Sequence, residues 1–153
     1  SKPIHKLRIM NIKQALKEKN KLVKRIGENT KLMQDFNSIE VGNQRPYSTT
    51  ELKNQLIKDR AELASLKAKI HIANTPVLED IFYMAELKSM IQSLKKMDCT
   101  EGKSNRDRYR MESELVLTSE MSLVQRNETI SELEKTIEEI QDKLDVFNSN
   151  TNI

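Results

Sequence analysis

The sequence predicts an all-α protein, and two observations carry that prediction: the composition and the spacing of apolar residues. Charged residues make up 32% of the 153 residues, aromatic residues 4%, and Gly and Pro number three each. This composition is typical of long helices and coiled coils and fits poorly with a compact α/β enzyme. Apolar residues recur three or four positions apart along most of the chain, as on one face of a helix. We therefore expect one helical domain over residues 1–153, an antiparallel bundle of four long amphipathic helices with coiled-coil-like packing.

The first helix is expected over about residues 4–40. Its predicted apolar stripe consists of Ile12, Leu16, Val23, Ile26, Leu32, Met33, Phe36 and Ile39. Gly42 and Pro46, in the stretch VGNQRPYS (41–48), mark the loop that follows it.

The second helix is expected over about residues 50–73. Ser48 and Glu51 have the spacing of a capping box, in which each side chain satisfies a backbone amide at the helix start. The predicted apolar stripe consists of Leu52, Leu56, Leu63, Leu66, Ile70 and Ala73. Pro76 ends the helix because the residue before a proline disfavours helical geometry.

The third and fourth helices are expected over about residues 77–97 and 120–147, separated by a polar loop and an extended segment. The inward positions of the third helix are predicted to be Leu78, Ile81, Ala85, Ile91 and Leu94. Those of the fourth form two rows with sevenfold spacing: Leu123, Ile130, Ile137 and Leu144, and then Leu133, Ile140 and Phe147. The tail NSNTNI (148–153) is expected to fray, although Ile153 could fold back.

Residues 108–120, RYRMESELVLTSE, alternate between two faces, which predicts a short extended segment at about 109–118. Met111, Leu115 and Thr118 would also suit the start of the fourth helix. An extended segment needs a partner strand, and two are plausible: the loop at about 39–47, or the same segment of a second copy around a two-fold axis. The second option predicts an oligomer interface made of Tyr109, Arg110, Met111, Glu114, Leu115 and Leu117.

Two apolar stripes contain a charged residue. Asp59 lies on the stripe of the second helix, and Arg126 lies on the Leu133 row of the fourth. The interpretation that the sequence favours is that both side chains lie at the stripe edge and reach water. The alternative is a buried Asp59–Arg126 ion pair that fixes the register of the helices.

Charge is distributed unevenly along the chain. Residues 1–31 carry ten Lys or Arg against two Glu, a net charge of +8, whereas residues 111–153 carry three Lys or Arg against ten Asp or Glu, a net charge of −7. We expect the basic first helix and the acidic fourth helix to lie near each other, within one chain or between copies. The alternative is that the first helix binds nucleic acid or an anionic membrane surface. Its lysines are expected to be spread around the helix, and no aromatic residues alternate with them to stack on bases.

No sequence motif for catalysis, cofactor binding or metal binding is present. The three glycines are isolated, and neither His5 nor His71 follows a Glu three residues earlier, as a di-iron bundle requires. Cys99 is the single cysteine, so it forms no intrachain disulfide, and it suggests a reducing compartment. It lies in a polar loop with no His nearby in sequence, which argues against a reactive thiol. We expect a cytoplasmic protein that is not an enzyme, without cofactor or metal and with no evident small-molecule substrate.

Five short motifs, taken in order, resemble a known family of small, mostly helical bacterial proteins of unknown function, some of which carry the name septicolysin. The motifs are ALKEKNKLVKRI (15–26), FNSIEVGNQRP (36–46), KIHIANT (69–75), SELV (113–116) and IQDKLDVFNSNTNI (140–153). The chain departs from the family at Ser149, where a Trp is usual, and at Val116, where a Lys is usual. The resemblance implies a helical fold, no known catalytic residues, and, from the family name alone, a membrane-active cytolysin as an alternative function.

The long helices, the complementary charges and the extended segment all predict self-association. We therefore expect a non-enzymatic helical protein that assembles into a homo-oligomer and has a structural or scaffolding role.

Overall fold

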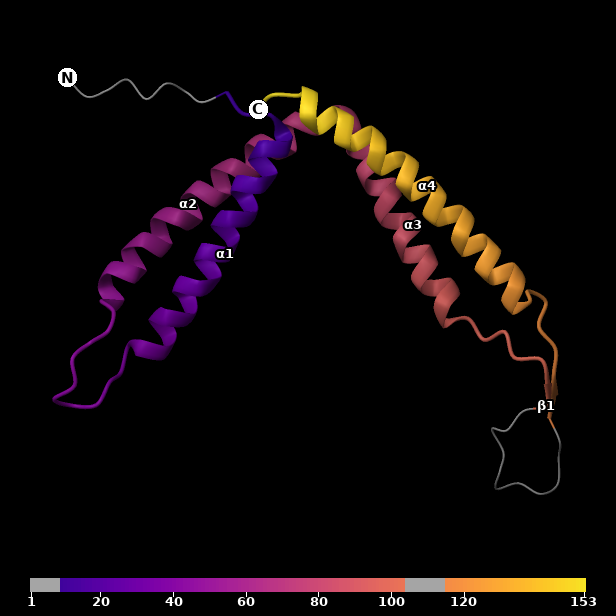
Figure 1. Cartoon of the computed structure of the whole chain (residues 1–153), viewed down its shortest axis with the longest axis horizontal. Coiled ribbons are helices and arrows are strands. Elements are labelled where there is room, and N and C mark those ends of the chain that lie inside the picture. Colours follow the sequence, from indigo (N-terminus) through magenta and orange to yellow (C-terminus); the bar gives the residue numbers. More distant parts are fainter. Residues whose placement is uncertain (1–8, 104–114) are drawn as a thin grey trace. The chain divides into compact units, whose positions relative to one another are not determined.

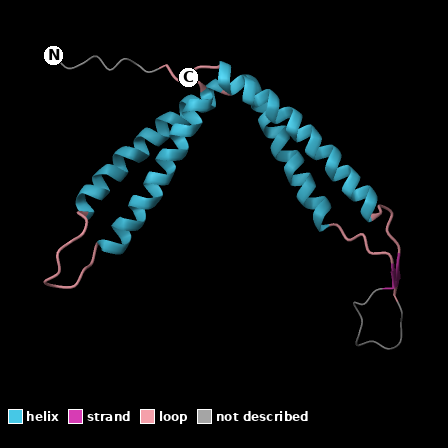
Figure 2. Ribbon diagram, in the orientation of Figure 1, coloured by secondary structure: helices cyan, strands magenta, loops and turns pink. Residues whose placement is uncertain are grey.

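The structure, a computed structural model, describes residues 9–103 and 115–153, and it confirms the predicted all-α fold class (Figures 1 and 2). The elements are α1 (Ile12–Phe36), α2 (Thr49–Ala73), the 3₁₀ turn Thr75–Val77, α3 (Leu78–Lys96), β1 (Gly102–Lys103), β2 (Val116–Leu117) and α4 (Leu123–Asn150). The chain divides into two compact units, Ser1–Pro76 with Asp145–Ile153, and Val77–Leu144. The first unit contains α1, α2 and the last turns of α4, and the second contains α3 and the rest of α4. Each unit has its own core cluster, whereas a single bundle was expected from the sequence.

The first helix is shorter than predicted, because polar side chains fix both of its ends. Asn11 accepts a hydrogen bond from the Gln14 amide at 2.8 Å, and the Gln14 side chain accepts one from the Asn11 amide at 3.0 Å, so α1 begins with a capping box. At the other end, the Arg45 guanidinium donates to the carbonyl oxygens of Phe36 and Asn37 at 3.2 and 2.8 Å. These bonds satisfy carbonyls that a helix end leaves without partners, and the helix stops at Phe36.

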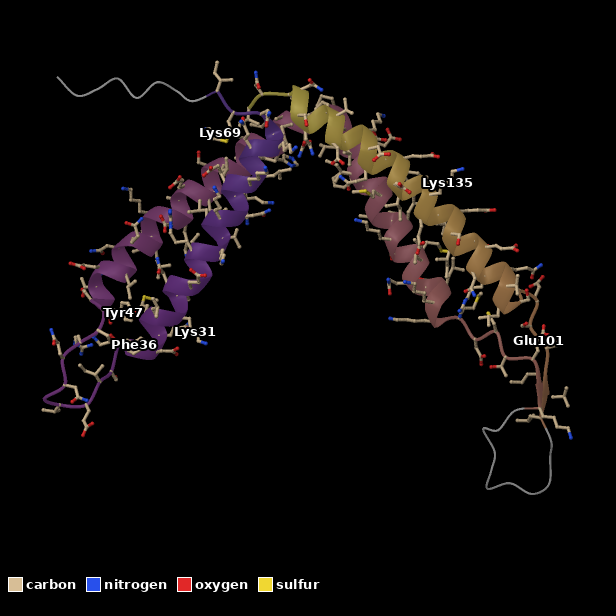
Figure 3. The ribbon with its side chains drawn as sticks, in the orientation of Figure 1. Lys31, Phe36, Tyr47, Lys69, Glu101 and Lys135 are labelled. Carbon is tan, nitrogen blue, oxygen red and sulfur yellow. The ribbon has the colours of Figure 1, made fainter. Side chains whose placement is uncertain are left out.

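The second helix begins as predicted. The Ser48 hydroxyl accepts a hydrogen bond from the Glu51 amide at 3.2 Å, and α2 runs from Thr49 to Ala73. The loop between α1 and α2 is held by a tilted contact between the rings of Phe36 and Tyr47, whose centroids are 5.2 Å apart (Figure 3).

The helices α1 and α2 lie side by side as a hairpin (Figure 1). Its core contains Leu22 and Ile26 of α1 and Leu56 of α2, with Met33 and Leu63 packed against it. The predicted stripe of α1 is wrong in part. Its buried residues are Ile12, Ala15, Leu22 and Ile26, whereas Val23 is 47% exposed. Two neighbouring lines of apolar side chains run along α1, one through residues 15 and 22 and one through residues 16 and 23. The contact with α2 buries the first of these lines.

The second hairpin consists of α3 and α4. Ile91 and Leu94, near the end of α3, pack against Ile130, near the start of α4, and Met97, Met121, Leu133 and Ile137 lie around them. The Lys143 ammonium lies 2.8 Å from the Asp80 carboxylate, so the end of α4 meets the start of α3 and the two helices are antiparallel. The two predicted rows of α4 hold at Ile130, Leu133, Ile137 and Leu144, but Leu123 is 52% exposed. In α3 the predicted inward residue Ala85 is exposed, and Leu87 is buried in its place.

The tail does not fray. Helix α4 continues to Asn150, and the last residues pair with the start of α1, an arrangement that we call the terminal clasp. Its hydrogen bonds run from the Ile12 amide to the Thr151 carbonyl at 2.9 Å and from the Ile153 amide to the Met10 carbonyl at 3.0 Å. The Asn11 side chain also donates to the Ser149 carbonyl at 3.3 Å, and Ile12 is fully buried. The sequence allowed Ile153 to fold back but did not predict its partner, because the two paired segments lie at opposite ends of the chain.

Candidate assembly surfaces and a buried ion pair

Asp59 is 1% exposed and lies on the core stripe of α2. Its carboxylate receives two hydrogen bonds from Arg25 of α1, from Nε at 3.0 Å and from a terminal nitrogen at 2.9 Å. The Gln55 side chain, one turn earlier on α2, donates a third at 2.8 Å. This bidentate geometry gives strong charge-assisted hydrogen bonds, and it joins α1 to α2 at one defined position.

The hydrogen bonds from Arg25 hold the pKa of the Asp59 carboxyl below its usual range, with a smaller contribution from Gln55. Burial opposes this effect, because it removes the charged form from water. The Arg25 side chain remains 54% exposed, so its guanidinium keeps part of its hydration while it pairs with Asp59.

This geometry corrects the expectations for Asp59 and Arg126. Asp59 is buried and does not reach water, and its partner is Arg25 and not Arg126. Arg126 is half-buried, and its guanidinium donates to the Asn127 side chain at 3.2 and 3.3 Å. Arg25 could not be identified as the partner from the sequence, because it lies beside the apolar stripe of α1 and because hairpin register cannot be read from one helix alone.

The extended segment has a partner that the sequence analysis did not consider. Val116 pairs with Lys103 and Leu117 with Gly102 in an antiparallel strand pair, so β1 comes from the predicted polar loop and not from residues 39–47. Gly102 adopts a φ of +86°, a backbone conformation that residues with a side chain rarely adopt. Of the predicted interface residues, Tyr109, Arg110, Met111 and Glu114 lie outside the described residues. Leu115 is 48% exposed and Leu117 is half-buried.

Helix α2 has a second apolar face that α1 does not cover, which we call the outer face of α2. It consists of Ile57, Ala61, Ala64, Ala68 and Ile72, all exposed, with the two isoleucines at 63% and 71%. At about 100° per residue, these positions fall within an arc of roughly 80°, on the side of α2 opposite its core stripe. Exposed basic residues border this face: Lys53, Lys58, Lys67 and Lys69.

Helix α3 also presents uncovered apolar side chains, on a face that we call the outer face of α3. Phe82, Tyr83 and Met90 are 61%, 51% and 50% exposed. Two exposed carboxylates, Glu79 and Glu86, lie among them, and all five positions fall within an arc of about 100°. Large exposed side chains grouped in this way are typical of a surface that binds another macromolecule.

Five of the six lysines of α1 are gathered, contrary to expectation, on one face of the helix, whereas Lys19 lies on the side of the buried stripe. Glu28 lies on the lysine face too, 3.9 Å from Lys24. The exposed residues Lys13, Lys17, Lys21, Lys24 and Lys31 fall within an arc of about 80° opposite the buried stripe. Helix α1 as a whole carries seven Lys or Arg against three Asp or Glu, and α4 carries three against seven. The predicted basic and acidic segments are therefore α1, in the first hairpin, and α4, in the second.

A shallow depression of about 550 Å³ lies where α1 ends and α2 begins. It is lined by Met33, Gln34, Asn37, Thr49, Thr50 and Lys53. The buried hydroxyl of Thr49 has no hydrogen-bond partner within the described part of the chain. The lining offers amides, hydroxyls and one ammonium group, but no carboxylate, imidazole or thiol that would transfer a proton or attack a substrate.

No family model, no curated protein and no solved structure matches the chain. The resemblance to the septicolysin-named proteins, and the cytolysin function that it implies, therefore stay predictions. Within residues 9–103 and 115–153, no helix has the length and apolar character needed to span a bilayer. The same residues contain no group of three or more His, Cys, Asp or Glu placed to hold a metal ion.

Proposed function

We propose that this protein is a helical assembly module: a non-enzymatic, cytoplasmic structural protein that associates with copies of itself. The observation that carries the proposal is the pair of uncovered apolar faces on α2 and α3. Exposing side chains such as Ile72 and Phe82, at 71% and 61%, to water is unfavourable by about 25 cal/mol per Å² of apolar surface. Covering these faces with another chain removes that cost.

The opposite charges of the helices support association between copies. The hairpin of α1 and α2 carries twelve Lys or Arg against six Asp or Glu, whereas α4 carries an excess of four carboxylates. Complementary charged surfaces accelerate the encounter of two chains and select their relative orientation.

The experiment is light scattering of the full chain after size-exclusion chromatography, over a wide concentration range. The proposal expects a mass that is a multiple of 17.8 kDa and that rises with concentration until assembly is complete. A mass of 17.8 kDa at every concentration would overturn it.

The lysine face of α1 favours a second candidate function, the binding of a polyanion such as nucleic acid. Five lysines on one helix face can contact successive phosphates, and such binding weakens steeply with salt. A gel-shift assay at low salt tests this candidate with a Lys17→Glu/Lys24→Glu double variant. A matched control is Lys88→Glu/Lys95→Glu, which makes the same charge change on α3. Binding that the control retains and the α1 variant loses supports the candidate, and no retardation of the wild-type chain refutes it.

A further inference from the structure

The outer faces of α2 and α3 complement each other in size. The centre of the α2 face is formed by Ala61, Ala64 and Ala68, whose side chains are small enough to let another helix approach closely. The α3 face projects Phe82, Tyr83 and Met90, which are large. Aromatic side chains that enter a shallow apolar channel are the usual centres of binding energy in protein interfaces.

The two faces also complement each other in charge. On α3, Glu79 and Glu86 are seven residues apart, which corresponds to about 10 Å along the helix. On α2, Lys53 and Lys67 border the apolar channel on one side, and Lys58 and Lys69 border it on the other, where Glu62 is also exposed. A helix that places Phe82 in the alanine channel can therefore direct its carboxylates toward the basic border of Lys53 and Lys67.

Pairing a face with its own copy is less favourable. Two outer faces of α2 in antiparallel contact would bring basic border residues such as Lys53 and Lys67 against each other. Two outer faces of α3 would bring Glu79 and Glu86 together at the centre of an apolar contact, where unpaired charge is costly.

We propose that the outer face of α3 docks onto the outer face of α2 in a second copy of this chain. The inference rests on the proposed self-association, and it identifies the surfaces that meet. Each copy carries both faces, so the α2 face of one copy can receive the α3 face of another.

The test uses one substitution on each face. Ala64→Glu puts a charged, bulky side chain in the channel, and Phe82→Ser removes the largest apolar group of the α3 face. Both positions are exposed, so the helical content measured by circular dichroism should not change. Gln92→Glu is the matched control, because it adds the same charge at an exposed position of α3 outside the outer face. Each interface variant should raise the dissociation constant of the oligomer by about tenfold or more, and the control should leave it unchanged.

A mixing experiment shows that the contact joins separate copies. When the Ala64→Glu chain is mixed with the Phe82→Ser chain, an intact α2 face meets an intact α3 face once in every mixed dimer. We expect mixed dimers, detected by native mass spectrometry with one chain isotopically labelled, to be more stable than dimers of either variant alone. Mixing that gives no gain overturns the contact between copies.

The outcomes separate this inference from the proposed function. If the wild-type chain forms oligomers that Ala64→Glu and Phe82→Ser leave intact, the self-association stands and the α2–α3 contact is refuted. If the wild-type chain is monomeric at every concentration, both are refuted.

Discussion

Asp59 shows how one polar side chain can specify the pairing of two helices. It occupies a position of the α2 core stripe that hydrophobic spacing would fill with leucine, between Leu56 and Leu63. A carboxylate buried there is tolerable only where a cation and further donors reach it, and Arg25 and Gln55 do so. A shift of α1 along α2 would separate Arg25 from Asp59, so we expect other registers to be strongly disfavoured.

Replacing Arg25 and replacing Asp59 should change the free energy of unfolding in different ways. Arg25→Ala leaves a buried carboxylate with Gln55 as its one remaining described partner, and we expect it to lower the free energy of unfolding. Asp59→Leu replaces the buried charge with an apolar group, and we expect it to be neutral or stabilising. Urea denaturation followed by circular dichroism measures both.

The control for the pair is Arg60→Ala, which removes another arginine of the same hairpin. Arg60 donates a long hydrogen bond of 3.4 Å to the Thr30 hydroxyl. We expect its loss to change the free energy of unfolding by less than about 0.5 kcal/mol. If Arg60→Ala lowers the free energy of unfolding as much as Arg25→Ala does, the effect of Arg25→Ala does not come from its pairing with Asp59.

Asp59 should also make stability depend on pH. Its pKa is lower in the folded chain than in the unfolded chain, where an aspartate has a value of about 3.9. The resulting stability is fully present above the unfolded pKa and is lost as the pH falls through the folded pKa. We expect the wild-type chain to lose more stability than Asp59→Leu on acidification from pH 6 to about pH 3. Parallel losses in the two proteins would contradict this.

At the scale of the elements, the helices were predictable and many of their ends and partners were not. The stretch from Ser48 to Ala73 carries its own start signal and a regular stripe, so α2 was predicted to within one residue. The capping box of Asn11 and Gln14 is also a local signal, but it went unrecognised in the sequence, and the start of the helix was placed near residue 4. The strand pair of β1 and β2, the Arg25–Asp59 pair and the terminal clasp each join residues far apart in sequence. The periodicity of a single element carries no information on such contacts.

The terminal clasp should protect the start of α1. Deleting residues 151–153 removes the hydrogen bond from the Ile12 amide to Thr151 and the one from the Ile153 amide to Met10. We expect hydrogen exchange at the Ile12 amide to accelerate by about tenfold or more. The Leu52 amide, which bonds to Ser48 in the same hairpin, should exchange at an unchanged rate. Equal exchange at Ile12 in the full and shortened chains would mean that the clasp contributes no stability.

At the scale of the whole molecule, the separation of charge between helices should make assembly depend on salt. Raising the NaCl concentration from about 50 mM to 500 mM shortens the screening length from about 14 Å to about 4 Å. With exposed ion pairs contributing up to about 1 kcal/mol each, we expect the dissociation constant of the oligomer to rise by about fivefold. Sedimentation velocity at each salt concentration measures this. A dissociation constant that falls as salt rises would indicate association through apolar contacts alone.

The terminal clasp also has a consequence for the order of events during synthesis. On the ribosome, α1 and α2 emerge first, and their hairpin can pair before the rest of the chain exists. The residues that complete the clasp, Thr151 and Ile153, are made roughly 140 residues later. The hairpin of α1 and α2 therefore forms early but gains the terminal clasp last. A chain that stops prematurely after α3 lacks the hydrogen bond to the Ile12 amide, so the start of α1 opens more often and is more exposed to proteolysis.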